Sequence, residues 1–133
     1  ACALLFILAG CQSAMATYTG SGDTKTVATV RIVTVEGEKL YDNKVKVIDD
    51  VPTVYMALKA AAEDRDLSLD IMGEDDGMFL NGISDLIGED PNYWMYYINR
   101  EMAMAGIGTQ AIHEGDVVEF IYGDYNVGYV EVK

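Results

Sequence analysis

The amino-acid sequence predicts a small α+β domain in which one helix packs on antiparallel strands. β-Branched residues fill Thr26–Val35, and apolar side chains alternate with a period of two over Val117–Tyr122, as expected for strands with one buried face. A helical period of apolar residues occurs once, after Thr53. With 133 residues, half of them hydrophobic, the chain can form the core of one domain with short extensions.

The N-terminus predicts a secretion signal. Ala3–Ala9 is apolar, too short to span a bilayer as a helix, and ends in small residues. The sequence opens without methionine or a basic segment, so we expect the true start to lie upstream. Leu8-Ala9-Gly10-Cys11 resembles the bacterial lipobox, which implies diacylation of the Cys11 sulfur and cleavage before it. Residues 1–10 are then a truncated lipoprotein signal peptide, and the alternative is a truncated buried helix with a chance cysteine.

Residues 11–25 combine the lipidated cysteine with a segment rich in Thr, Ser, Ala and Gly, which predicts a flexible stalk. The folded domain is expected to span 26–133. Its first strand, Thr26–Val35, is followed by a turn at Glu36–Glu38 and a returning strand at Lys44–Ile48, so these strands should form a hairpin.

The single long helix is predicted to begin after Pro52, with Thr53 as its N-cap, and to end near Asp66. One apolar stripe should face the core, and its small side chains let the helix lie close to a sheet. The residues of this stripe are Val54, Ala57, Leu58 and Ala61.

Short elements are expected between the helix and the aromatic segment. Gly73–Gly77 is an acidic turn, Met78–Leu80 a short strand and Asn81-Gly82 a second turn. An apolar piece at Ile83–Ile87 and a polar loop at Gly88–Asn92 follow.

The segment Tyr93–Asn99 holds four aromatic residues, among them the only tryptophan of the chain. Alternation places Trp94, Tyr96 and Ile98 on one face and the other residues on the opposite face. Both faces carry apolar bulk, so we expect a central strand with one face in the core and the other covered or available to a partner.

A Met-, Ala- and Gly-rich loop at Met102–Gly108 is expected next, and a turn at Glu114–Asp116 precedes the strand Val117–Tyr122. The face of that strand which bears Glu119 is predicted to point outward. Tyr125–Val132 is expected to form a last strand.

Charge and cysteine content exclude several classes of function. The formal net charge is −13, which disfavours binding to nucleic acid or to anionic lipid head groups. The acidic excess is interpreted either as a means of solubility or as a means of cation capture. Both cysteines, Cys2 and Cys11, precede the domain, so disulfide, cysteine–zinc and cysteine-nucleophile chemistry are not expected within it. His113 is the sole histidine, and no pair of carboxylates stands out as catalytic. We therefore expect no enzymatic activity.

Five ordered motifs resemble the C-terminal domain of transcobalamin and intrinsic factor and its relatives in bacterial surface lipoproteins. Arg100 departs from the pattern because the family usually has glycine after the asparagine of the tryptophan strand, so the hairpin is expected to use a longer or different loop. The motifs are Val30–Gly37, Thr53–Leu58, Gly77–Ile83, Tyr93–Asn99 and Gly115–Tyr122.

The resemblance implies a β-grasp-like sheet with one helix that, in the vitamin carriers, acts as a lid over cobalamin held by a separate helical barrel. For this chain it implies an extracytoplasmic recognition module, with cobalamin as one candidate ligand and no covalent cofactor. The function expected is a membrane-anchored module that binds a small molecule, a corrinoid among the candidates, alongside a partner domain or protein. The alternative is an adhesion or protein-interaction module without a small-molecule pocket.

Candidate ligand contacts lie on the tryptophan strand and the loop after it, beside a mouth flanked by Gly88–Tyr93 and Met102–Gly108. Trp94 and Tyr96 also fit the core, and the opposite-face tyrosines fit either role. His113 is either a metal ligand or a solvent-facing residue, and the acidic residues near Asp75 are either a calcium site or solvated turns. No metal or catalytic residue is assigned. The candidate ligand contacts are Tyr93, Trp94, Tyr96, Tyr97, Asn99, Met102 and Met104.

Overall fold

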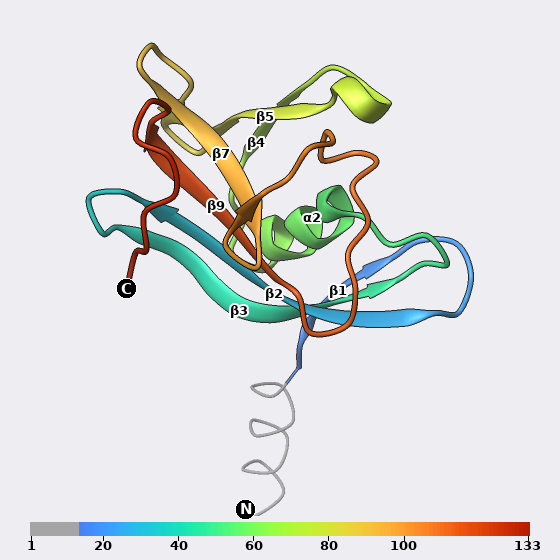
Figure 1. The fold of residues 1–133 in the computed structure, drawn as a ribbon. Helices are drawn as coiled ribbons and strands as arrows, with labels where there is room; N and C mark the ends of the chain where they lie inside the picture. Colours follow the sequence, from blue (N-terminus) through green and yellow to red (C-terminus); the bar gives the residue numbers. More distant parts are fainter. Residues whose placement is uncertain (1–13) are drawn as a thin grey trace, which may run out of the picture.

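The computed structural model describes residues 14–133 as one mixed α+β fold (Figure 1). Cys11 and the expected signal peptide 1–10 lie outside the described residues. No helix within 14–133 is long and apolar enough to cross a membrane. The elements are β1 (Ala16–Thr19), β2 (Lys25–Thr34), β3 (Lys39–Ile48), α2 (Val54–Asp64), β4 (Leu69–Met72), the 3-10 helix η1 (Asp75–Gly77), β5 (Phe79–Ile83), β6 (Leu86–Ile87), β7 (Asn92–Ile98), β8 (Glu101–Met102) and β9 (Val117–Asp124).

The main sheet has six strands in the order β1-β3-β2-β9-β7-β8. β2 and β3 form the expected antiparallel hairpin, and β9 pairs antiparallel with β7. The expectation of a purely antiparallel sheet is wrong, because β2 pairs parallel with β9 and β1 pairs parallel with β3. Parallel pairing is open to β9 because the long chain between β3 and β9 supplies the crossover that parallel strands need.

Helix α2 packs on the sheet as its sequence predicts. The Thr53 hydroxyl accepts a hydrogen bond from the Met56 N–H at 3.4 Å and caps the helix. Small side chains on the buried stripe allow the helix to lie close to β3 and β1. Val54, Ala57, Leu58 and Ala61 are all fully buried.

Five residues of the expected stalk belong to the sheet, namely Ala16–Thr19 of β1 and Lys25, the first residue of β2. Ala16–Thr19 pair in register with 45–48 of β3, and Ala16 and Tyr18 pack against the core. The prediction of a flexible stalk over 11–25 is therefore wrong at 16–19 and at 25. An alternation of only four residues suffices for a short edge strand once β3 offers a partner, and Lys25 pairs with Ile48 of β3.

The small second sheet consists of β4, β5 and β6, and its central strand runs through a predicted turn. The predicted turn at Asn81-Gly82 is wrong, since β5 continues through these residues and the chain turns after Ile83. The Asn81 amide donates to Asp70 across the β4–β5 pair at 2.8 Å. A Cβ on Gly82 would lie 2.3 Å from the Ile87 side chain, so this glycine permits a close approach between strands.

The face of the main sheet opposite α2 is covered by the C-terminal segment. Glu119, predicted to point outward, is 3% exposed and lies 2.6 Å from the guanidinium of Arg31, its register neighbour on β2. Arg31 also donates to the Val132 carbonyl at 2.6 Å. The expected last strand at 125–132 is wrong, because this segment is held across the sheet by side-chain contacts and not by a strand ladder.

Candidate functional site

Strand β7 lies near the edge of the main sheet and not at its centre as predicted. It pairs with β9 over its whole length on one side. On the other side the two-residue strand β8 pairs only with Tyr97 and Ile98. Most of the outer edge of β7 therefore lacks a neighbouring strand within the main sheet.

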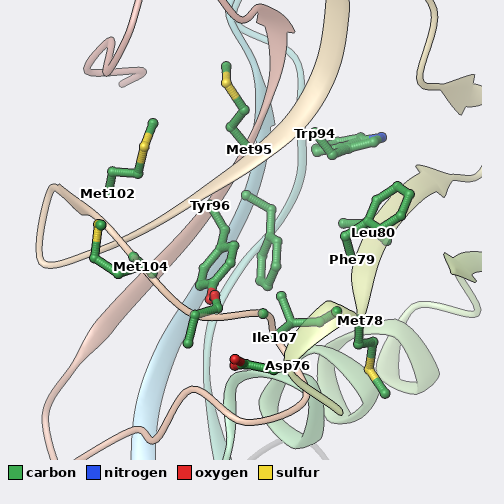
Figure 2. Close-up of a pocket in the computed structure, with 15 residues that line it drawn as sticks. Asp76, Met78, Phe79, Leu80, Trp94, Met95, Tyr96, Met102, Met104 and Ile107 are labelled. Atoms are coloured by element: carbon green, nitrogen blue, oxygen red, sulfur yellow. The ribbon is translucent and has the colours of Figure 1, made fainter. Parts of the chain in front are cut away.

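A groove of about 360 Å³ lies beside this edge (Figure 2). One wall is Met78–Leu80 at the start of β5, and another is Trp94–Tyr96 of β7. The loop from Met102 to Ile107 forms a third wall, and Phe120 of β9 also lines the groove. The three walls come from the second sheet, the main sheet and the loop after β8.

The aromatic side chains of β7 are held in fixed positions. The Trp94 indole N–H donates to the Leu86 carbonyl at 2.7 Å, and its ring lies 5.2 Å from that of Tyr122. The Tyr96 ring stacks on Phe120 with centroids 5.9 Å apart. A fixed aromatic surface binds an apolar ligand at a low cost in side-chain entropy.

Tyr96 also connects β7 to the loop wall. Its hydroxyl donates to the Ala105 carbonyl. Burial, together with the nearby Asp76 carboxylate, raises the pKa of Tyr96 to about 12, so the hydroxyl stays a hydrogen-bond donor at physiological pH. The loop is therefore tied to the aromatic wall by a bond that does not titrate near neutrality.

Two methionines form a soft, exposed rim. The side chains of Met102 and Met104 are 58% and 96% exposed, and Phe79 across the groove is 49% exposed. Methionine is flexible and polarizable and adapts to differently shaped apolar partners. Exposed apolar residues gathered around a groove are typical of a binding site.

Among the described residues that line the groove, Asp76 alone carries a charge. One of its carboxylate oxygens accepts a hydrogen bond from the Thr109 hydroxyl at 2.7 Å. Figure 2 shows Asp76 below the hydroxyl of Tyr96. The groove thus suits a ligand that has an apolar body and a hydrogen-bond donor or a positive charge at one end.

The predicted ligand contacts divide into two groups. Trp94, Tyr96, Met102 and Met104 line the groove together. The other three do not line it. Tyr93 packs against Tyr125 with ring centroids 5.7 Å apart, and Tyr97 is buried against Tyr129 on the opposite face of the sheet. Asn99 lies in the β7–β8 turn, where its amide donates to Asp116 at 3.0 Å.

Of the two loops predicted to flank the mouth of the site, one lies at the groove. The Met102–Gly108 loop flanks the groove, whereas the Gly88–Tyr93 loop does not line it. Sequence reasoning missed the β5 wall, although Met78–Leu80 belongs to a recognised motif and its exposed Phe79 is a signal of binding.

The β7–β8 hairpin is tighter than the sequence predicts. Ile98 pairs directly with Glu101, so the loop is only Asn99 and Arg100, with φ angles of +53° and +74°. This is the geometry of a type I′ turn, and the expectation of a longer loop is wrong. Arg100 adopts the left-handed conformation in the place where glycine would adopt it without strain.

The other candidate residues do not form a metal cluster. His113 is 80% exposed, and its backbone N–H donates to Asp116 at 2.8 Å. The acidic residues around Asp75 form η1 and its flanks. Within residues 14–133 there is no group of three or more His, Cys, Asp or Glu side chains placed to hold a metal ion.

Known proteins are similar to this chain both in sequence and in fold. A family model described as a domain of unknown function (DUF4430) matches residues 52–124, more than half of the chain. The structure of haptocorrin in complex with Cbi is similar in fold, with a TM-score of 0.68 and 16% identity over 80% of this chain. This chain spans only 27% of that haptocorrin chain.

A second solved structure is similar over almost its whole length. It is a candidate metal-binding protein from Ruminococcus gnavus ATCC 29149, with a TM-score of 0.54 and 16% identity, and the match covers 78% of this chain and 99% of that chain. Comparison with curated proteins gives no match. At 16% identity the two structures establish a shared fold.

Proposed function

We propose, from the premise that the chain belongs to the DUF4430 family and is a transcobalamin-like domain, that it is a non-catalytic module which binds a small molecule. The observation that carries the proposal is the groove beside β7, which combines fixed aromatic rings, an exposed methionine rim and one carboxylate. Such a combination of apolar walls and few polar groups is typical of ligand sites.

A corrinoid is the first ligand to test. The similar haptocorrin structure is a complex with Cbi, and this chain corresponds to about a quarter of that protein. An open groove of about 360 Å³ covers one side of a large planar ligand and leaves the rest for a partner domain or protein. The proposed role is that of a lid which needs a second component for tight binding.

We propose that the protein lies outside the cytoplasm and is anchored through Cys11. The lipobox-like Leu8–Cys11 supports this proposal. Ala16, the first residue of β1, follows Cys11 by five residues, so the connecting chain reaches at most about 17 Å. The domain would therefore lie close to the membrane surface.

Isothermal titration calorimetry with cobinamide and with cobalamin tests the ligand. We expect saturable heat with both, because the groove contacts the shared planar part. Ala103→Phe should abolish that heat by filling the groove, whereas Val127→Phe, at a position that is 64% exposed and outside the groove, should leave it unchanged. Absence of heat at millimolar ligand, or equal effects of the two variants, would refute corrinoid binding at this site.

Metabolic labelling with radioactive palmitate tests the anchor. The chain is expressed in bacteria with a start methionine and a basic segment placed before Ala1. Label and membrane association should be lost in Cys11→Ser and kept in Cys2→Ser. Loss of the label in neither variant would refute lipidation at Cys11.

A further inference from the structure

Within residues 14–133, the outer edge of β7 carries backbone groups that have no hydrogen-bond partner in the protein. The Asn99 N–H donates to the Val117 carbonyl at 2.8 Å, which shows that the odd-numbered residues of this strand direct their N–H and C=O groups toward β9. Backbone groups of neighbouring residues in a strand point to opposite edges. The N–H and C=O groups of Trp94 and Tyr96 therefore point away from β9, to the side of the groove.

Both ends of this edge are closed. At one end the backbones of Asn92 and Glu89 exchange two hydrogen bonds, of 2.6 and 2.8 Å. At the other end Ile98 pairs with Glu101. Within residues 14–133 no hydrogen bond reaches the backbone N–H or C=O of Trp94 or Tyr96. Four groups remain unpaired in a window of about 20 Å, measured at ~3.4 Å per residue.

This edge lacks the features that normally protect a strand edge. Lysine, proline, inward charges or a bulge usually prevent pairing with another chain. Tyr93–Ile98 contains none of these residues, and its register with β9 is regular. Trp94–Tyr96 also lines the groove, so the edge lies beside open space and not beneath packed side chains.

We propose that an extended segment of a partner protein adds to this edge as a short extra strand. Its backbone would accept from the N–H groups of Trp94 and Tyr96 and donate to their carbonyls, while its side chains contact the methionine rim. The segment is apolar and carries a lysine or arginine toward Asp76, the charge that lines the groove. A second copy of this chain is disfavoured as the occupant because two molecules of charge −13 repel each other.

This proposal needs the open edge and does not depend on the corrinoid proposal. A peptide and a small molecule would share the groove and exclude each other. Failure of one proposal is therefore separable from failure of the other, because calorimetry with cobinamide reports the first ligand and backbone protection reports the second.

Amide hydrogen exchange, measured by NMR on the full chain, tests the added strand. The probe is a blocked hexapeptide of alternating valine and threonine with a lysine at one end. On saturation, exchange at Trp94 and Tyr96 should slow at least tenfold. Exchange at Met95 should change little, because its N–H already faces β9.

Two N-methylated peptides provide the sharpest control. Each has the probe sequence and is N-methylated at alternate residues, so that the N–H groups along one edge of the extended peptide are blocked. Only one of them should lose binding, because an added strand uses one edge. Loss with neither peptide, or no slowing at millimolar probe, would overturn the proposal. Protection that grows with protein concentration in the absence of peptide would also overturn it, by assigning the edge to a second copy.

The charge is tested by Asp76→Asn, which keeps an acceptor for the Thr109 hydroxyl. This variant should bind the lysine peptide about three- to tenfold more weakly and a neutral analogue unchanged. The control is Asp75→Asn on the same turn, outside the groove lining, where asparagine tolerates the positive φ of +49°. Equal weakening by the two variants would remove Asp76 from the proposal.

Discussion

Removing the hydroxyl of Tyr97 should stabilise the protein. Tyr97 is 2% exposed and packs with Val33, Ile121 and Val132 beneath the C-terminal segment. Its hydroxyl is buried and has no hydrogen-bond partner within the described part of the chain. Burial raises the pKa of this hydroxyl, in line with an environment that offers no polar compensation.

The expected magnitude follows from two opposing terms. An unpartnered buried hydroxyl destabilises the folded state by about 1–3 kcal/mol. Tyr97→Phe removes this cost but also removes the dispersion contacts of one oxygen atom, worth up to about 1 kcal/mol at ~0.1–0.2 kcal/mol per atom pair. The free energy of unfolding should therefore rise by about 1 kcal/mol, which corresponds to a Tm increase of about 4 °C for a domain of this size.

Urea denaturation of Tyr97→Phe and Tyr129→Phe provides the assay, because the same chemical change should have opposite effects at the two sites. The Tyr129 ring lies 5.1 Å from that of Tyr97, but its hydroxyl donates to the Glu119 carboxylate at 2.8 Å. Losing a hydrogen bond to a charged group should lower the free energy of unfolding by about 1.5–3 kcal/mol. A Tyr97→Phe variant less stable than the wild type would refute the reasoning.

Three further predictions follow from the geometry. Arg100→Gly should unfold with a free energy about 1 kcal/mol higher than Arg100→Ala in urea denaturation, because only the β-carbon of alanine strains a φ of +74°. Glu119→Ala should lower the midpoint of urea denaturation by an amount that corresponds to about 3 kcal/mol, since it leaves the largely buried Arg31 guanidinium without its closest carboxylate. The raised pKa of Tyr96 implies stability that is fully present below pH 10 and lost as the pH rises through about 12, so the free energy of unfolding should fall less steeply in this range for Tyr96→Phe than for the wild type.

Elements whose signal is local were predictable from the sequence. Thr53 and the stripe that follows it gave α2 because capping and helical periodicity act within a few residues. Glu119 was misplaced because its environment depends on a distant strand. The parallel pairing of β2 with β9 puts Arg31 beside it in register, and this ion pair allows a carboxylate to be buried where alternation alone predicts exposure.

In the candidate site, too, the residues that are close in sequence were predicted and the contacts between distant segments were not. Trp94, Tyr96, Met102 and Met104 were found because one strand and the loop after it are adjacent in sequence. The β5 wall was missed because Met78–Leu80 reaches the groove only through the packing of the second sheet against β7. Tyr97 was misassigned because the C-terminal segment, predicted as a strand, instead crosses this face of the sheet and covers the Tyr97 ring through side-chain contacts.

Apart from the ring surface that lines the groove, the available part of β7 is its edge. One face packs its Trp94 and Tyr96 rings on the core side, and the other is covered at Tyr97 by the C-terminal segment. The tight turn at Asn99-Arg100 starts β8 in register, and a further pair would join Ala103 to Tyr96 and close the edge. The chain leaves the sheet after Met102 and forms the loop wall of the groove instead, so the short length of β8 creates both the groove and the unpaired backbone beside it.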